Sequence, residues 1–163
     1  MRRTAKTITD LLLGALLVLL ICLTLPGLFG VQCYAVVSGS MEPVLPVGSA
    51  VYVQKKAPDT IKGGEIITFL TNQSKNRVTH RVIKSDPRRK VFVTKGDANR
   101  QKDASLVSWE NVCGVEIGCV PYAGYVLEFL NNWKGKAAAV CFFLVLLLIS
   151  EALTVRREVL QKE

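Results

Sequence analysis

A long apolar stretch near the N-terminus constrains the fold of this chain more than any other feature. Residues 8–29 carry no charge after Asp10 and contain the apolar block from Leu11 to Ile21. About 20 such residues are enough to cross the hydrocarbon core of a bilayer. A cleaved signal peptide, the alternative, has a shorter apolar core of about 7 to 15 residues before its small-residue cleavage site. We therefore predict an uncleaved transmembrane helix over residues 8–29.

A second apolar stretch lies near the C-terminus. Residues 137–153 read AAAVCFFLVLLLISEAL, with Glu151 near the end, where its carboxylate can reach the membrane interface. At about 17 residues, this stretch lies at the lower limit for a membrane span. We predict a second transmembrane helix here, which makes the chain a multi-pass protein of the cell membrane in contact with the lipid bilayer.

Basic residues next to the two predicted spans indicate the orientation. Residues 1–7 and 154–163 are rich in Arg and Lys, which favour the cytoplasmic side of a membrane. Lys134 and Lys136 lie on the opposite side and run against this rule. We predict cytoplasmic ends at residues 1–7 and 154–163 and an extracytoplasmic domain over residues 30–136.

The net charge of +8 first suggests a nucleic-acid partner. However, the sequence has no basic stripe interleaved with aromatic residues, and much of the excess charge flanks the predicted spans. Anionic lipid headgroups explain the charge more simply. We therefore predict no nucleic-acid partner.

The five cysteines do not make a disulfide framework. Cys22 and Cys141 fall inside the predicted spans, and the other three allow at most one bridge. Cys113 and Cys119 could pair across a hairpin or remain free thiols, and the sequence leaves both interpretations open. Because the chain has no CxxC motif and no His/Cys cluster, we predict no metal and no cofactor.

Between the two spans, short apolar runs alternate with turn residues. Runs of four to eight residues rich in Val, Ile, Thr and aromatic residues are typical of strands. The expected strands are residues 34–37, 50–53, 66–70, 78–83, 91–94 and 112–120. The predicted fold class is therefore mainly β, an all-β extracytoplasmic domain flanked by two transmembrane helices.

The segment Ser38-Gly39-Ser40-Met41-Glu42-Pro43, just outside the first span, is the first candidate for chemistry. A small turn after an apolar strand leaves a hydroxyl exposed and lets a substrate backbone approach closely. By itself, the segment could also be an ordinary strand-to-turn transition.

His80 is the only histidine in the chain. A lone histidine is more often structural than catalytic, and this one lacks the partners that a metal site needs. If Ser40 is a nucleophile, however, it needs a base that titrates near neutral pH, and His80 is the obvious candidate. A carboxylate that accepts the second imidazole N–H would hold the ring in the correct tautomer. Asp97 and Asp103 are the two candidates, and each could instead be an ordinary turn residue.

Taken together, these segments resemble the type I signal peptidases, and in particular their ER-type branch of eukaryotes, archaea and some Gram-positive bacteria. The resemblance rests on SGSMEP, KGGEII, THRVIK, TKGDAN and GCVPYAG, which follow one another in this order. Most bacterial members have a lysine where this chain has His80, whereas a histidine resembles the ER-type branch. A Gram-positive or archaeal source is the expectation.

The resemblance implies a role for each of four residues. Ser40 corresponds to the family's nucleophile and His80 to its general base. Asp103 resembles the aspartate assigned to the third position, and we place it ahead of Asp97. Asp97 resembles a second acidic residue that is important for activity.

The resemblance also implies how substrate is held. Ser38, together with the backbone N–H of Ser40, resembles the oxyanion hole of the Ser–Lys branch, and Gly39 and Met41 complete the expected substrate-binding turn. The expected partners are secretory preproteins with small residues at positions −1 and −3 of the signal peptide, bound as an extended strand. Accessory subunits remain possible partners.

The expected function is that of a membrane-bound serine endopeptidase that removes N-terminal signal peptides from secreted preproteins. The alternative is a non-catalytic or partner-dependent membrane subunit of a secretion complex. A self-cleaving regulator of related β-fold fits less well, because such proteins are soluble and use a lysine base. Asn72-Gln73-Ser74 matches a glycosylation pattern that often arises by chance.

Overall fold

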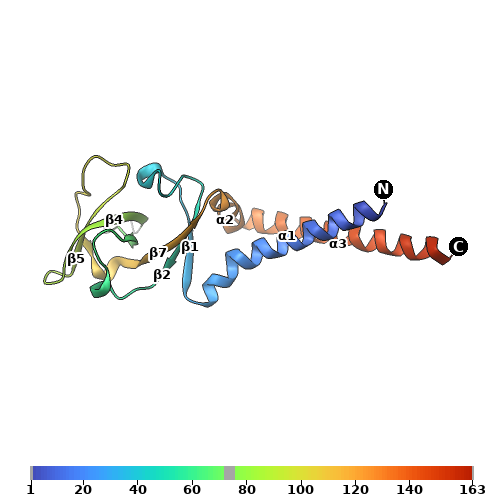
Figure 1. Cartoon of the computed structure of the whole chain (residues 1–163), viewed down its shortest axis with the longest axis horizontal. Coiled ribbons are helices and arrows are strands. Elements are labelled where there is room, and N and C mark those ends of the chain that lie inside the picture. The colour runs from blue at the N-terminus through green and yellow to red at the C-terminus, as the bar shows by residue number, and fades with distance from the viewer. Residues whose placement is uncertain (1, 72–75, 163) are drawn as a thin grey trace. The chain divides into compact units, whose positions relative to one another are not determined.

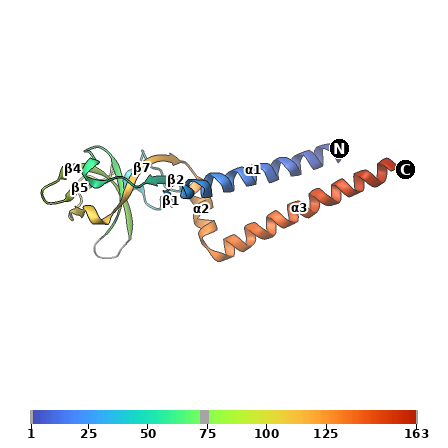
Figure 2. The ribbon, with the colours of Figure 1, turned by 90° about the horizontal axis from the view of Figure 1, so that it is seen from below.

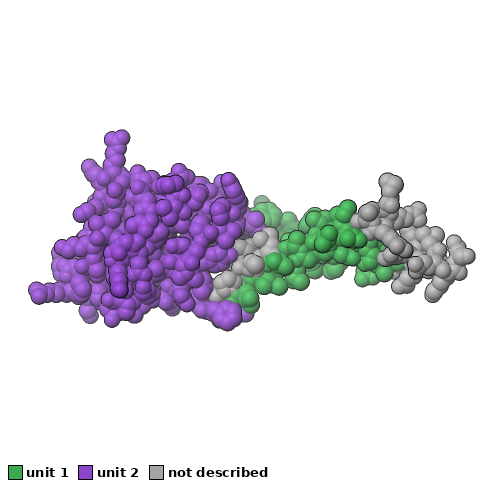
Figure 3. All heavy atoms as spheres, viewed as in Figure 1, with its two compact units in different colours: residues 1–25, 129–163 green, residues 26–128 purple. Residues whose placement is uncertain are grey.

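A computed structural model describes residues 2–71 and 76–162 of the chain. The chain forms two compact units, one of residues 1–25 and 129–163 and the other of residues 26–128 (Figure 3).

The unit of residues 26–128 is built on a curled antiparallel sheet of seven strands (Figure 1). The strand order is β1-β2-β7-β3-β4-β5-β6. The strands are β1 (Val31–Ala35), β2 (Ala50–Gln54), β3 (Ile66–Leu70), β4 (Arg77–Asp86), β5 (Val91–Lys95), β6 (Val107–Ser108) and β7 (Val112–Val120). The mainly β fold class predicted from the sequence is confirmed.

The strand bounds follow the expected apolar runs, except that β4 continues past the expected end at residue 83 to Asp86. Two further differences concern β1 and β6. The run expected at residues 34–37 corresponds to β1, which begins earlier, at Val31, because Gly30 adopts a positive φ of 73° and ends the preceding helix. The two-residue strand β6 was not expected, because its pairing with β5 is a tertiary contact that leaves no local pattern.

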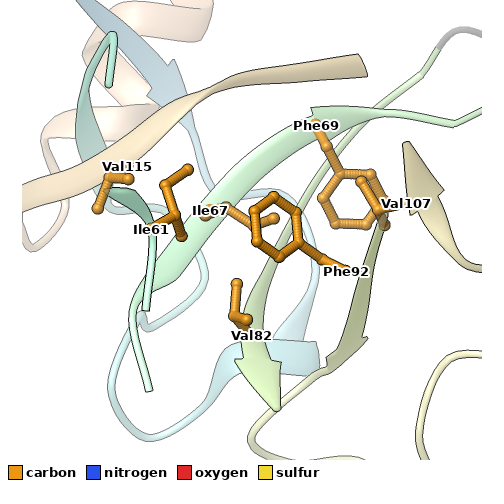
Figure 4. Close-up of a cluster of buried hydrophobic side chains, with 7 residues drawn as sticks. All are labelled: Ile61, Ile67, Phe69, Val82, Phe92, Val107 and Val115. Carbon is orange, nitrogen blue, oxygen red and sulfur yellow. The ribbon is translucent and has the colours of Figure 1, made fainter. Parts of the chain in front are cut away.

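Two apolar clusters pack against the sheet. The first gathers side chains from β3, β4, β5, β6 and β7 together with a loop residue, and Phe92 lies at its centre with no exposed surface (Figure 4). Its buried members are Ile61, Ile67, Phe69, Val82, Phe92, Val107 and Val115. The second cluster consists of Met41, Leu45, Val51, Val53 and Ile66. Met41 links the second cluster to the Ser-Gly-Ser turn, so burial of this side chain holds the turn in place.

The unit of residues 1–25 and 129–163 contains two long helices, α1 (Arg2–Leu28) and α3 (Trp133–Lys162). They run in opposite directions, so that the start of α1 and the end of α3 lie at the same end of the pair (Figure 2). The Ser150 hydroxyl on α3 donates a 2.9 Å hydrogen bond to the Asp10 carboxylate on α1. A shorter helix, α2 (Ala123–Asn131), precedes α3 in the chain.

Among the described residues, one helix is long and apolar enough to cross a membrane, the 22-residue stretch Trp133–Thr154 of α3. The predicted span, residues 137–153, lies within this stretch. Lys134 and Lys136 do not end the helix, because lysine is a good helix former, and α3 also continues to Lys162 through the predicted cytoplasmic tail. The first predicted span, residues 8–29, lies within α1 except for Phe29, but several of its side chains, including Cys22, lie outside the described residues.

The cysteines of the sheet are free thiols, and the predicted alternative of a hairpin disulfide is wrong. Cys113 and Cys119 lie on the same strand, β7, rather than on two strands of a hairpin. Six residues along a strand span roughly 20 Å, whereas a disulfide needs Cα atoms within about 6.8 Å. The Asn72-Gln73-Ser74 triplet lies outside the described residues.

Candidate active site

The Ser40 hydroxyl is presented by a short 3-10 helix over Gly39–Met41. Ser38 precedes this helix in an extended conformation, and its side chain does not cap the helix. The Ser38 hydroxyl instead lies 3.4 Å from the Ser40 hydroxyl. Because Met41 is almost fully buried, the two serines face outward from an anchored turn.

His80 lies in the middle of β4, opposite Ile67 of β3. The residue is buried, at 8% exposed, and the ring of Phe69 packs edge-on against the imidazole at 6.3 Å between centroids. The Nε2 atom of His80 lies 3.2 Å from the Ser40 hydroxyl oxygen. This distance is at the long end of a hydrogen bond, as is common in enzymes without substrate.

The other ring nitrogen of His80 contacts Asp103. Nδ1 lies 2.6 Å from Oδ2 of Asp103. Because an ionised carboxylate only accepts hydrogen bonds, the contact assigns the proton to Nδ1. Nε2 is then the acceptor for the hydroxyl proton of Ser40. Both contacts of the imidazole therefore favour the tautomer that a general base needs.

Thr94 of β5 supports the carboxylate of Asp103. Its hydroxyl donates a 2.6 Å hydrogen bond to Oδ2 of Asp103, the same oxygen that contacts His80. The backbone N–H of Asp103 donates to the Thr94 carbonyl at 2.9 Å. Thr94 has no exposed surface, so these two bonds hold the carboxylate against a rigid strand.

Asp97, the other candidate carboxylate, pairs with Arg81 instead. The Arg81 guanidinium donates to both carboxylate oxygens of Asp97, at 2.9 Å and 2.6 Å. These bonds lower the pKa of Asp97 below its ordinary value and raise the pKa of Arg81. Arg81 also donates to the Gly64 carbonyl at 2.7 Å. Asp97 therefore ties its own loop to β4.

The loop that Asp97 anchors lies directly against the Ser40 backbone. The N–H of Ala98 donates a 3.0 Å hydrogen bond to the Ser40 carbonyl. Gly96 approaches the same carbonyl so closely that a Cβ built on it would lie 2.6 Å from the oxygen. The loop thus fixes where the nucleophile candidate sits.

Sequence reasoning assigned no role to Thr94, Arg81 or Gly96. Each lies in a segment that carried the family resemblance, TKGDAN or THRVIK. Their place in these motifs was the only sequence feature that could have indicated a role. Each residue acts through contacts with another element of the fold, and such contacts cannot be read from the sequence.

Two cavities flank the Ser40–His80 pair. The smaller, about 100 Å³, is lined by residues that include Ser38, Ser40, Met41 and Thr79. The larger, about 500 Å³, is lined by residues that include His80 and Asp103. In the described part of the chain, no group of three or more His, Cys, Asp or Glu side chains could hold a metal ion.

The hydroxyl, imidazole and carboxylate form a hydrogen-bonded chain with the order found in serine hydrolases. The hydroxyl proton of Ser40 can pass to Nε2 of His80, and the Asp103 carboxylate can stabilise the resulting imidazolium. A serine activated in this way can attack a carbonyl carbon. The arrangement suits acyl transfer.

Comparison with known proteins places the chain in a family. A family model described as "Signal peptidase, peptidase S26" matches residues 8–93, more than half of the chain. The chain is 35% identical over 116 residues to Signal peptidase complex catalytic subunit SEC11C of Rattus norvegicus, covering 64% of this chain and 60% of the relative. It is also 35% identical over 122 residues to Signal peptidase I W of Bacillus subtilis (strain 168), covering 66% of this chain and 63% of the relative.

The chain therefore belongs to the signal peptidase family, and the resemblance to its ER-type branch is confirmed. It spans about 60% of the length of the curated relatives described above.

Proposed function

We propose that this protein is a membrane-bound serine endopeptidase that cleaves N-terminal signal peptides from secreted preproteins. The observation that carries the proposal is the chain of contacts from Ser40 to His80 to Asp103, with distances of 3.2 Å and 2.6 Å. Family membership supports the choice of signal peptides as the substrate class.

In the proposed mechanism, the Ser40 oxygen attacks the carbonyl carbon of residue −1 while His80 accepts the hydroxyl proton. Collapse of the tetrahedral intermediate breaks the peptide bond, and His80 donates the proton to the departing amine. Water then attacks the acyl-enzyme, again with His80 as base, and releases the signal peptide with a free carboxylate. Asp103 holds the imidazole throughout.

Ser38 and the backbone N–H of Ser40 are the proposed oxyanion donors. The Ser38 hydroxyl lies 3.4 Å from the Ser40 hydroxyl and does not cap the 3-10 helix, which leaves it directed at the reacting centre. One donor of this kind contributes about 3 kcal/mol to transition-state stabilisation. Gly39 gives the turn room for the substrate backbone, and the buried Met41 forms part of the adjoining small cavity.

We assign the smaller cavity, about 100 Å³, to the side chains of the signal peptide next to the scissile bond. It adjoins Ser40 and is well below the size of an ordinary ligand pocket, about 300 Å³ or more. A cavity of this size suits small residues at positions −1 and −3. An extended substrate would pair with the backbone of the neighbouring strands.

We propose that the protein is anchored by two spans, residues 8–29 and the apolar part of α3. The extracytoplasmic catalytic domain then occupies residues 30–136, and residues 1–7 and 154–163 are cytoplasmic, with basic residues at the cytoplasmic surface. Anchoring enzyme and preprotein in the same bilayer raises their effective concentration. Accessory subunits are possible partners, since relatives are named as subunits of a signal peptidase complex.

The test is cleavage of preproteins by the detergent-solubilised full chain. Wild type should cut at the signal junction, while Ser40→Ala and His80→Ala should each lose several orders of magnitude in rate, because the groups act as a unit. Ser85→Ala, a change to a half-buried serine on the same strand as His80, is the matched control and should cleave like wild type.

Two results would count against the proposal. Cleavage that survives in Ser40→Ala would exclude Ser40 as the nucleophile. Folded wild type that cuts no preprotein alone but does so with membrane extract from its source would favour the partner-dependent subunit.

A further inference from the structure

The larger cavity, about 500 Å³, has no role in the proposed function so far. It touches His80 and Asp103 but not Ser40, whereas the smaller cavity touches Ser38 and Ser40 but not His80. Val78 lines both cavities. The two spaces therefore lie on either side of the reacting pair and adjoin each other at Val78.

The two cavities also differ in which faces of the β3–β4 pair supply most of their strand residues. Thr68 and its cross-strand partner Thr79 line the smaller cavity. Phe69 and His80, each one residue further along its strand, line the larger one. Successive side chains of a strand point to opposite faces, so Thr68 and Thr79 belong to one face and Phe69 and His80 to the other, while Val78 lines both cavities.

The direction of proton transfer indicates whether the residues before or after the scissile bond lie next to the larger cavity. His80 must protonate the amine that leaves, so the residues after the scissile bond lie beside the imidazole. An extended substrate also alternates its side chains. If the side chain at −1 occupies the smaller cavity, the side chain at +1 points to the opposite face.

We infer that the larger cavity is a subsite for the first residue of the mature protein, position +1, and that it favours a bulky apolar side chain there. This inference rests on the proposed function. The wall beyond His80 and Asp103 is largely apolar, with Phe69, Leu106 and Val107. A volume of about 500 Å³ accommodates any single side chain, and Leu106, at 38% exposed, lies where the cavity meets solvent.

The test compares preproteins that differ only at +1, with Leu, Gly, Lys or Asp in that position. Wild type should cleave the Leu substrate with a kcat/KM about tenfold above the Gly substrate. Leu106→Glu should raise the ratio of kcat/KM for the Lys substrate to kcat/KM for the Asp substrate about tenfold over wild type, because the new carboxylate attracts Lys and repels Asp at +1. Leu106→Lys should lower the same ratio by a similar factor, because its charge is opposite.

Ile83 provides matched controls, because it is 40% exposed on β4 and does not line either cavity. Ile83→Glu and Ile83→Lys should leave the ratio of Lys to Asp cleavage unchanged. Shifts of equal size in the Ile83 and Leu106 variants, or no shift in either pair, would overturn the subsite. Equal cleavage of the Leu and Gly substrates by wild type would also overturn the subsite, although the proposed function would stand. If wild type cleaved none of the preproteins, the proposed function itself would fail.

Discussion

Gly96→Ala should impair cleavage while leaving the protein folded. The added methyl group would lie 2.6 Å from the Ser40 carbonyl oxygen and 2.7 Å from the Asn99 side-chain nitrogen. Ordinary contact begins at 3.4 Å, so the loop and the Ser40 backbone must separate by about 0.8 Å. The bond from the Ala98 N–H to the same carbonyl, 3.0 Å long, opposes this movement.

The size of the effect follows from this displacement. Misplacing a reacting group by about 1 Å costs roughly a hundredfold in rate, and overpacking a tight contact costs about 1–3 kcal/mol of folding stability. We therefore expect kcat/KM for preprotein cleavage to fall roughly a hundredfold, with a lowered but cooperative thermal transition.

Gly118→Ala is the control, because a Cβ built on Gly118 meets nothing within 4 Å. This variant should cleave like wild type. If folded Gly96→Ala cleaved at the wild-type rate, the loop that Asp97 anchors would not position Ser40, and the predicted link between loop displacement and catalysis would be refuted.

Two further predictions concern the carboxylates. Thr94→Val removes the hydrogen bond from the Thr94 hydroxyl to Asp103 and should lower kcat/KM about tenfold or more. Thr94→Ser keeps the hydroxyl and should cleave at a rate near that of wild type. Equal rates for Thr94→Val and wild type would contradict the role of Thr94. Because Arg81 lowers the pKa of Asp97, the ion pair stabilises the fold above the ordinary aspartate pKa of about 3.9, and this stability is lost as pH falls through the lower folded-state value. Lowering the pH from 6 to 2 should therefore reduce the melting temperature of wild type more than that of Asp97→Asn. An equal loss of melting temperature in the two proteins would disprove the coupling.

Local patterns in the sequence predicted the mainly β fold class and singled out Ser40 and His80 as candidates, whose roles then came from the family resemblance. The strands were predictable because apolar runs bounded by turn residues report on the neighbours of each residue along the chain. Ser40 stood out through its small flanking residues, and His80 through being the only histidine. Both features can be recognised in the sequence without knowing the distances between residues in the folded chain.

The choice between Asp97 and Asp103 depended on the tertiary structure. Both aspartates lie in the same turn-rich segment, and the sequence ranked them only through resemblance to a family. In the fold, pairing of β4 with β5 places Thr94 and Asp103 beside His80, while Arg81, which follows His80 in the chain, binds Asp97.

The cysteines show the same division. Their number and spacing allowed a hairpin bridge, but Cys113 and Cys119 share one long strand. Sequence determines which residues are apolar, charged or flexible, and those properties act locally. Which carboxylate meets the imidazole, and which thiols can approach each other, is decided by strand pairing between distant segments, because only the folded chain sets the distances between them.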